Sequence, residues 1–205
     1  MPPVQTNSRH SVWALLAALA LLAVPSQALA HDGAGLVGGF GAGFSHPLSG
    51  LDHMLAMIAV GVWGAFLGRP LILALPVIFP GFMALGAGLG MLALPVPPVE
   101  AGIAVSVLTL GVMILFAVRA PALLACMIVA AFGLFHGYAH GLELPLSADP
   151  VGYTAGFVLS TGLLHLSGIA LGLLKSSGAG MLALRGAGGA IAIAGLIFVG
   201  GAITA

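Results

Sequence analysis

The sequence predicts an all-α membrane protein, a bundle of about six transmembrane helices that follows a cleaved signal peptide. Of the 205 residues, 60% are hydrophobic and 5% are charged, whereas a soluble domain carries roughly 25% charged residues. The apolar residues gather in runs of about 20, the length that crosses ~30 Å of hydrocarbon. The formal net charge is zero and no basic block is present, which argues against nucleic-acid binding.

The first thirty residues have the pattern of a secretory signal peptide. Arg9 and His10 precede the apolar run "VWALLAALALLAV" (12–24), and "ALA" (28–30) has the small residues of a cleavage site. An uncleaved first transmembrane helix is the alternative. Cleavage would make His31 the extracytoplasmic N-terminus, where its imidazole and the α-amine could chelate a metal together. The alternative for His31 is a disordered, solvated terminus.

Residues 31–205 are expected to form a single transmembrane domain, because the separators between the apolar runs are short and turn-like. The glycine-rich residues 33–44 are expected to be an extended or half-inserted lead-in, with a kinked extension of the first span as the alternative. The expected spans are about 47–68, 71–93, 99–118, 121–142, 151–174 and 186–204.

The charges predict the orientation of these spans. With His31 outside, the links after the first, third and fifth spans face the cytoplasm. These links hold all the Lys and Arg left after cleavage, as the positive-inside rule requires: Arg69, Arg119, Lys175 and Arg185. Most acids lie at the outer face: Asp32, Glu100, Glu143 and Asp149. We therefore expect a multi-pass protein of the bacterial cytoplasmic membrane with both mature termini outside.

Two motifs place ionisable groups inside apolar runs, "HPLSGLDHMLAM" (46–57) and "FHGYAHGLE" (135–143). Such groups are costly in a bilayer unless paired or solvated, so they are functional candidates. A rise of 1.5 Å per residue predicts two matching levels. The lower level, about 8–9 Å below the outer helix ends, holds Asp52, His53 and His136. The level near the outer surface holds His46, His140 and Glu143.

Imidazole together with carboxylate suits a divalent ion such as Ni²⁺, Co²⁺, Zn²⁺ or Cu²⁺, and the lack of thiolate ligands argues against Cu⁺. Asp52 is expected to be either a ligand or the acceptor that fixes the tautomer of the neighbouring imidazole. A purely structural polar network is the alternative for both motifs.

Four further residues are candidates by type and position. Met54 and Met57 are expected to pack in the core, and Glu100 is expected to be solvated. For His165 two readings stay open, a second station on a metal path and a hydrogen bond to Ser160 or Thr161.

The segments "GFSHPLSGLDHMLAMIAVGVWGAFLG" (43–68) and "FHGYAHGLE" (135–143) resemble the signatures of the HupE/UreJ family. That family comprises hydrogenase- and urease-accessory membrane proteins regarded as nickel or cobalt permeases. The resemblance covers the whole mature chain, and it implies metal binding by all six residues of the two levels. The H-x5-D-H spacing differs from the H-x4-D-H of the separate nickel/cobalt transporter family, whose coordination is therefore not transferred.

The resemblance implies an importer of Ni²⁺ or Co²⁺ rather than an enzyme, with the ion as cargo and no permanently bound cofactor. Its expected partners are the metal ion and the lipid bilayer; a homo-oligomer and a link to hydrogenase or urease maturation are allowed. No nucleotide-binding G-x-x-x-x-G-K-[ST] motif is present, so uptake is expected to be passive or driven by the membrane potential. The alternatives are a bis-histidine haem or electron-transfer protein, and a metal sensor or assembly partner without transport.

Overall fold

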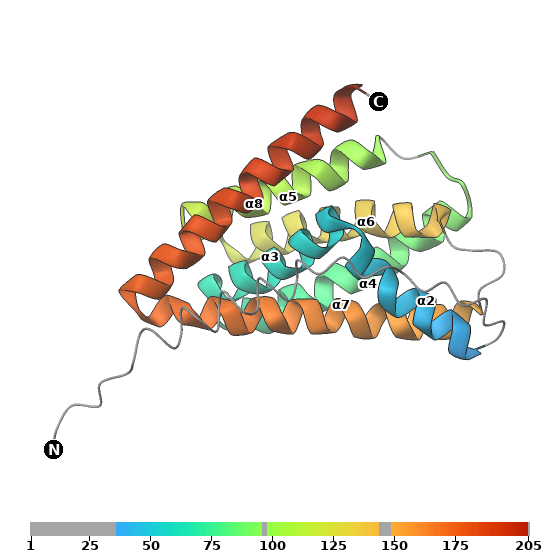
Figure 1. Ribbon diagram of the computed structural model, residues 1–205, viewed down its shortest axis with the longest axis horizontal. Helices are drawn as coiled ribbons and strands as arrows, with labels where there is room; N and C mark the ends of the chain where they lie inside the picture. The colour runs from blue at the N-terminus through green and yellow to red at the C-terminus, as the bar shows by residue number, and fades with distance from the viewer. Residues whose placement is uncertain (1–35, 96–97, 144–148, 205) are drawn as a thin grey trace, which may run out of the picture.

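The computed structural model describes residues 36–95, 98–143 and 149–204, and the regular structure in these ranges is entirely helical (Figure 1). The all-α prediction is therefore confirmed for them. The signal peptide and His31 lie outside the described residues. In chain order the elements are α2 (Leu36–Ser49), α3 (Leu51–Leu67), α4 (Leu71–Met91), α5 (Val99–Leu115), α6 (Ala122–Leu142), α7 (Pro150–Gly172), the 3-10 turn η1 (Leu173–Ser176) and α8 (Gly178–Thr204).

Among the described residues, four segments are long and apolar enough to cross a membrane: α4, α6, α7 with η1, and α8. A fifth is present if α2 and α3 count as one bent span. Helix α5 is also apolar, but with 17 residues it is shorter than each of the four long segments. The chain is thus a multi-pass helical membrane protein, and the number of six spans stays a prediction.

The segment before the first motif differs from the expected extended lead-in. Residues from Leu36 onward form helix α2, which includes Pro47, and the axis bends by 81° between α2 and α3. Gly50, at the junction, has an extended backbone. The extended reading was therefore wrong, and a kinked helical extension describes the segment. The reason is that helix satisfies backbone hydrogen bonds in lipid, while the glycines pack closely: Gly43 lies against the backbone of Tyr153.

The last helix also starts earlier than expected. Helix α8 begins at Gly178 rather than near 186, so the predicted polar link shrinks to η1 and Ser177. The Ser177 hydroxyl accepts a hydrogen bond from the Gly180 N–H at 3.0 Å, which satisfies a free donor of the first turn. Arg185 consequently lies inside α8, where its Nε donates to the Leu115 carbonyl at the end of α5 (2.8 Å).

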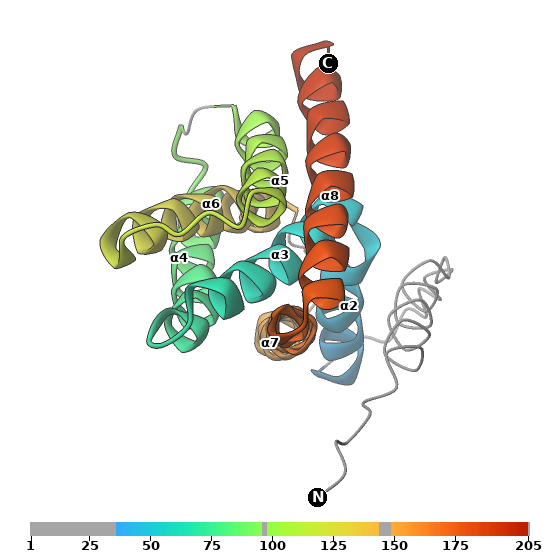
Figure 2. The ribbon, with the colours of Figure 1, turned by 90° about the vertical axis from the view of Figure 1, so that its left-hand side faces the viewer.

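Helix α3 lies at the centre of the bundle and is surrounded by the other helices (Figure 2). Its middle is fully buried, including Met57, Val60 and Trp63. The indole N–H of Trp63 donates to the Val118 carbonyl at 3.0 Å. The most extensive neighbouring pairs are α4 with α6, α5 with α8, and α2 with α7. The central helix carries the first histidine motif into the interior.

Glycine determines how closely α6 approaches α4. Gly133, Gly137 and Gly141 recur at every fourth position of α6, so they share one face. A Cβ added at Gly137 would collide with the backbone of Met83 in α4. Backbones without side chains between them can pack at short range in a membrane. The two histidines of α6 directly precede Gly137 and Gly141, so this glycine face also fixes their depth and direction.

Candidate metal centre

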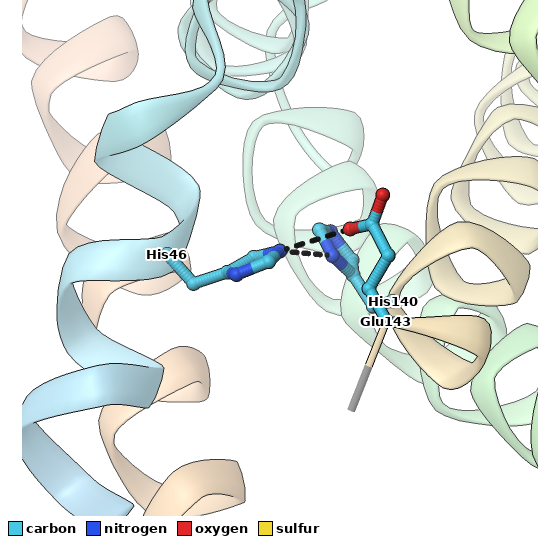
Figure 3. Close-up of side chains that lie close together, drawn as sticks. All are labelled: His46, His140 and Glu143. Atoms are coloured by element: carbon cyan, nitrogen blue, oxygen red, sulfur yellow. Dashed lines mark hydrogen bonds and ion pairs between the residues drawn. The ribbon is translucent and has the colours of Figure 1, made fainter. Parts of the chain in front are cut away.

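The end of α2 and the end of α6 bring three potential metal ligands together (Figure 3). His46 Nε2 lies 2.9 Å from His140 Nδ1 and 3.4 Å from Glu143 Oε2. One ligand atom of each residue lies within 4.8 Å of the others. We call His46, His140 and Glu143 the outer cluster. It is the set that the depth argument assigned to the surface level, and its role as a ligand set stays a prediction.

The bend between α2 and α3 makes this arrangement feasible. His46 and His53 are seven residues apart, which in a straight helix separates them by about 10 Å along the axis. Because the axis turns by 81° between them, both rings contact His140. The ring centroid of His140 lies 4.7 Å from that of His46 and 4.6 Å from that of His53.

Aromatic residues of α7 hold the outer rings in place. The Phe157 ring lies 4.5 Å from the His140 ring and 6.1 Å from the His46 ring, measured between centroids. Tyr153 lies 5.9 Å from the His46 ring. His140 is buried, whereas the side chain of Glu143 is 55% exposed. In the outer cluster the Glu143 carboxylate is therefore accessible to water, whereas the His140 imidazole is not.

A second group, deeper in the bundle, contains Asp52, His53 and His136, and we call it the inner cluster. The rings of His53 and His136 are 4.7 Å apart. Asp52 Oδ1 lies 2.8 Å from His53 Nδ1 and accepts the backbone N–H of His53 at 2.8 Å. An ionised carboxylate only accepts hydrogen bonds, so Nδ1 of His53 carries the proton. Nε2 keeps its lone pair, and it is buried without a partner.

Ser106 of α5 fixes the tautomer of His136, and the sequence reasoning missed it. Its hydroxyl oxygen is 2.6 Å from the Ile103 carbonyl and 2.9 Å from His136 Nε2. A carbonyl can only accept, so the single hydroxyl proton goes to Ile103 and the oxygen accepts the Nε2–H of His136. Nδ1 of His136 is then unprotonated. The sequence signal for Ser106 is a hydroxyl side chain within the apolar run of 99–115, but the sequence does not show its partner.

Both imidazoles of the inner cluster thus present an unprotonated, buried nitrogen without a hydrogen-bond partner, His53 Nε2 and His136 Nδ1. Leaving such atoms unpaired costs free energy in a purely structural network. Neutral imidazole nitrogens are also the donors that divalent transition metals prefer. The donor set therefore fits a metal cargo better than the structural alternative.

The haem alternative does not fit this packing. An axial pair needs a gap wide enough for a macrocycle between its two imidazoles. Instead, the His46 and His140 rings contact each other directly, as do the rings of His53 and His136, with centroid distances of 4.7 Å for both pairs.

The remaining candidates divide as follows. Met54 and Met57 lie in the core and Glu100 is exposed at the start of α5, as predicted. His165 is buried, but neither of its nitrogens has a hydrogen-bond partner. Of the two interpretations that the sequence left open for His165, the hydrogen bond to Ser160 or Thr161 is not formed, and the second station stays a hypothesis.

Comparison with known proteins gives a consistent result. The family described as "HupE / UreJ protein" matches residues 19–198. The chain is 45% identical over 177 residues to Protein HupE of Rhizobium leguminosarum bv. viciae, a match that covers 86% of this chain and 92% of that protein. No solved structure matches the chain. These matches confirm the resemblance seen in the two histidine motifs, and the chain belongs to the HupE/UreJ family.

Proposed function

We propose that the chain imports a divalent transition-metal ion, Ni²⁺ or Co²⁺, across the bacterial cytoplasmic membrane and is not an enzyme. Its membership of the HupE/UreJ family supports this proposal. The resemblance implies that the imported ion supplies hydrogenase or urease maturation. The ion is the transported substrate in this proposal.

The observation that carries the proposal is a pair of clusters of imidazole and carboxylate side chains at successive depths, of which the outer one brings three possible ligand atoms within 4.8 Å of one another. Each cluster combines imidazole with one carboxylate, Glu143 in the outer cluster and Asp52 in the inner one. His140 connects the clusters, because its ring contacts both His46 and His53. A binding protein without transport needs one such site, whereas movement through a membrane needs several sites in a row.

The geometry supports a stepwise entry. The exposed carboxylate of Glu143 attracts the hydrated cation, and His46 and His140 replace part of its water. His53 and His136 then take over with their unprotonated nitrogens, while Asp52 balances the charge of the ion. Because neighbouring rings are in contact, ligands can be exchanged one at a time. The membrane potential favours inward movement of a dication by about 4.6 kcal/mol per 100 mV.

Nickel uptake by sealed vesicles that contain only the purified protein tests this function. We expect uptake that depends on the protein and that is lost in His46→Ala and in His53→Ala. Ser167→Ala is the matched control, because this exposed hydroxyl of α7 bonds only to the Leu163 carbonyl of its own helix. Folded protein that binds nickel but gives no uptake would refute transport and favour a metal sensor or assembly partner.

A further inference from the structure

Helix α7 carries a buried polar group that neither cluster uses. His165 is 1% exposed, and both of its ring nitrogens lack a hydrogen-bond partner. Thr161 lies one helical turn earlier on the same face, is fully buried, and its hydroxyl is also without a partner. Unpaired polar atoms in a membrane interior are costly and therefore point to a function.

The depth of His165 follows from its neighbour on α3. A Cβ at Gly61 would collide with the backbone carbonyl of His165, so the two residues lie at one level. Gly61 is eight residues further along α3 than His53, which corresponds to about 12 Å. His165 therefore lies deeper than the inner cluster, toward the end of the bundle that carries the Lys and Arg residues.

One aromatic ring separates His165 from the inner cluster. Phe79 of α4 is fully buried, and its ring centroid lies 5.4 Å from that of His136 and 5.4 Å from that of His165. The rings consequently form an unbroken series from the outer surface inward. Their order is His46, His140, His53, His136, Phe79 and His165.

The chemistry at this depth differs from that of the two clusters. Imidazole and hydroxyl are present, but every Asp and Glu among the described residues belongs to the outer part of the chain's helices or to their outer ends. A neutral ligand set attracts a dication less than a set with a carboxylate does. Conduction requires sites weak enough for the ion to leave, and a neutral last site meets that requirement.

We propose that His165, assisted by Thr161, forms a second and weaker binding station for the divalent ion on the cytoplasmic side of Phe79. The ion reaches it after the Phe79 ring turns aside, and from it the ion leaves toward the cytoplasm. This inference rests on the proposed transport function for its role. Its existence as a binding site can be tested separately.

Equilibrium binding of Co²⁺ to the full-length protein in detergent tests the station without requiring transport. We expect the wild type to have a class of high-affinity Co²⁺ sites, called the tight class, and to bind one further Co²⁺ ion more weakly, which is the second class. His165→Leu keeps a buried side chain of similar size and removes both nitrogens, so it should lose the weaker ion and keep the tight class. Ser167→Ala on the exposed side of α7 should retain both classes, and Thr161→Val should weaken the second class about tenfold.

The reverse variant separates this inference from the proposed function. His46→Ala should weaken the tight class and leave the second ion bound. In vesicles, His165→Leu should lower nickel uptake by about tenfold. If the wild type binds both ions but vesicles take up none, transport is refuted and the second station stands.

If His165→Leu binds Co²⁺ with the stoichiometry and affinities of the wild type, the proposal of a binding station at His165 is refuted. If that variant does not purify as a folded protein, His165→Gln takes its place, because an amide keeps the polarity but is a poor ligand for these ions. Retention of the weaker ion in the Gln variant would refute the proposal equally.

Discussion

At the scale of single residues, the position of one proton decides whether a histidine can bind a metal. The Ser106 hydroxyl donates its hydrogen bond to the Ile103 carbonyl, so its oxygen accepts from His136 and keeps the proton of that ring on Nε2. Asp52 does the same for Nδ1 of His53. Two unrelated hydrogen bonds, from different helices, therefore leave one free lone pair on each of two rings that contact each other.

The first prediction concerns Ser106. Ser106→Ala removes the acceptor of the His136 Nε2–H, so the ring can switch to the tautomer that blocks Nδ1. We expect nickel affinity to fall by about 10- to 100-fold, as for other residues that orient a ligand. Calorimetry measures the affinity, and ¹⁵N spectra of the imidazoles report the tautomer. Ser167→Ala serves as the control, and an unchanged affinity in Ser106→Ala would show that the hydroxyl has no such role.

The second prediction is the dependence of uptake on pH. A protonated imidazole has no lone pair, so protons compete with the metal for every histidine ligand. Uptake should weaken as the outer pH falls below the range near 6.5 in which a solvated imidazole ordinarily titrates. Initial rates at a fixed free nickel concentration and a clamped membrane potential measure this effect. Rates that rise with acidity would contradict histidine ligation.

At the scale of elements, the third prediction tests the junction between α2 and α3. A Cβ at Gly50 would lie 2.9 Å from Asp52 Oδ1 and 3.1 Å from His53 Nδ1. Gly50→Ala should therefore displace the Asp52–His53 pair and lower nickel affinity, although the helices still form. Gly41→Ala, in α2, meets no atom within 4 Å and should bind nickel like the wild type. Equal affinities in the two variants would mean that the junction tolerates the extra carbon.

The fourth prediction concerns the face between α4 and α6. Gly137→Ala would place a Cβ against the Met83 backbone, which cannot move without shifting α4. Overpacking of this kind costs typically 1–3 kcal/mol, and more where backbone must shift. We expect a lower thermal unfolding temperature and weaker metal binding. Gly81→Ala on α4, with open space around it, is the control; a Gly137→Ala protein as stable as this control would refute the close contact.

At the scale of the whole molecule, the fifth prediction concerns orientation. Arg69 and Arg119 are exposed, so their charges can be changed without disturbing the core. Lys175 is less suitable, because its Nζ bonds to the Ala65 carbonyl. Replacing both arginines with Gln and adding Leu92→Lys and Leu94→Lys moves positive charge to the opposite end.

We expect this relocation to lower membrane yield or to mix the orientations seen with reporter fusions, because basic loops set topology. Arg69→Lys with Arg119→Lys keeps the charges in place and should insert normally. Normal yield and unchanged orientation of the relocated variant would show that these residues do not direct insertion.

The sequence predicts the helical class and the grouping of polar residues well, because both depend on composition and on spacing along one helix. His140 and Glu143 share a stripe on α6 by spacing alone. The bend at Gly50 was harder to predict, because glycine both ends helices and allows close packing. The packing of α2 against α7, which the sequence does not show, decides the direction of the chain before the bend. Ser106 could not be assigned, because its partner His136 lies on another helix.

One consequence follows from the position of His140 between the two clusters. A neutral imidazole has a single lone pair, so His140 can ligate one ion at a time, either through Nδ1, which faces His46, or through Nε2. While His140 ligates an ion in the outer cluster, it cannot ligate a second ion on the side of the inner cluster. An ion that His140 hands on from Nδ1 to Nε2 requires the ring proton to move to the other nitrogen, so this ring holds ions one after another and never two at once.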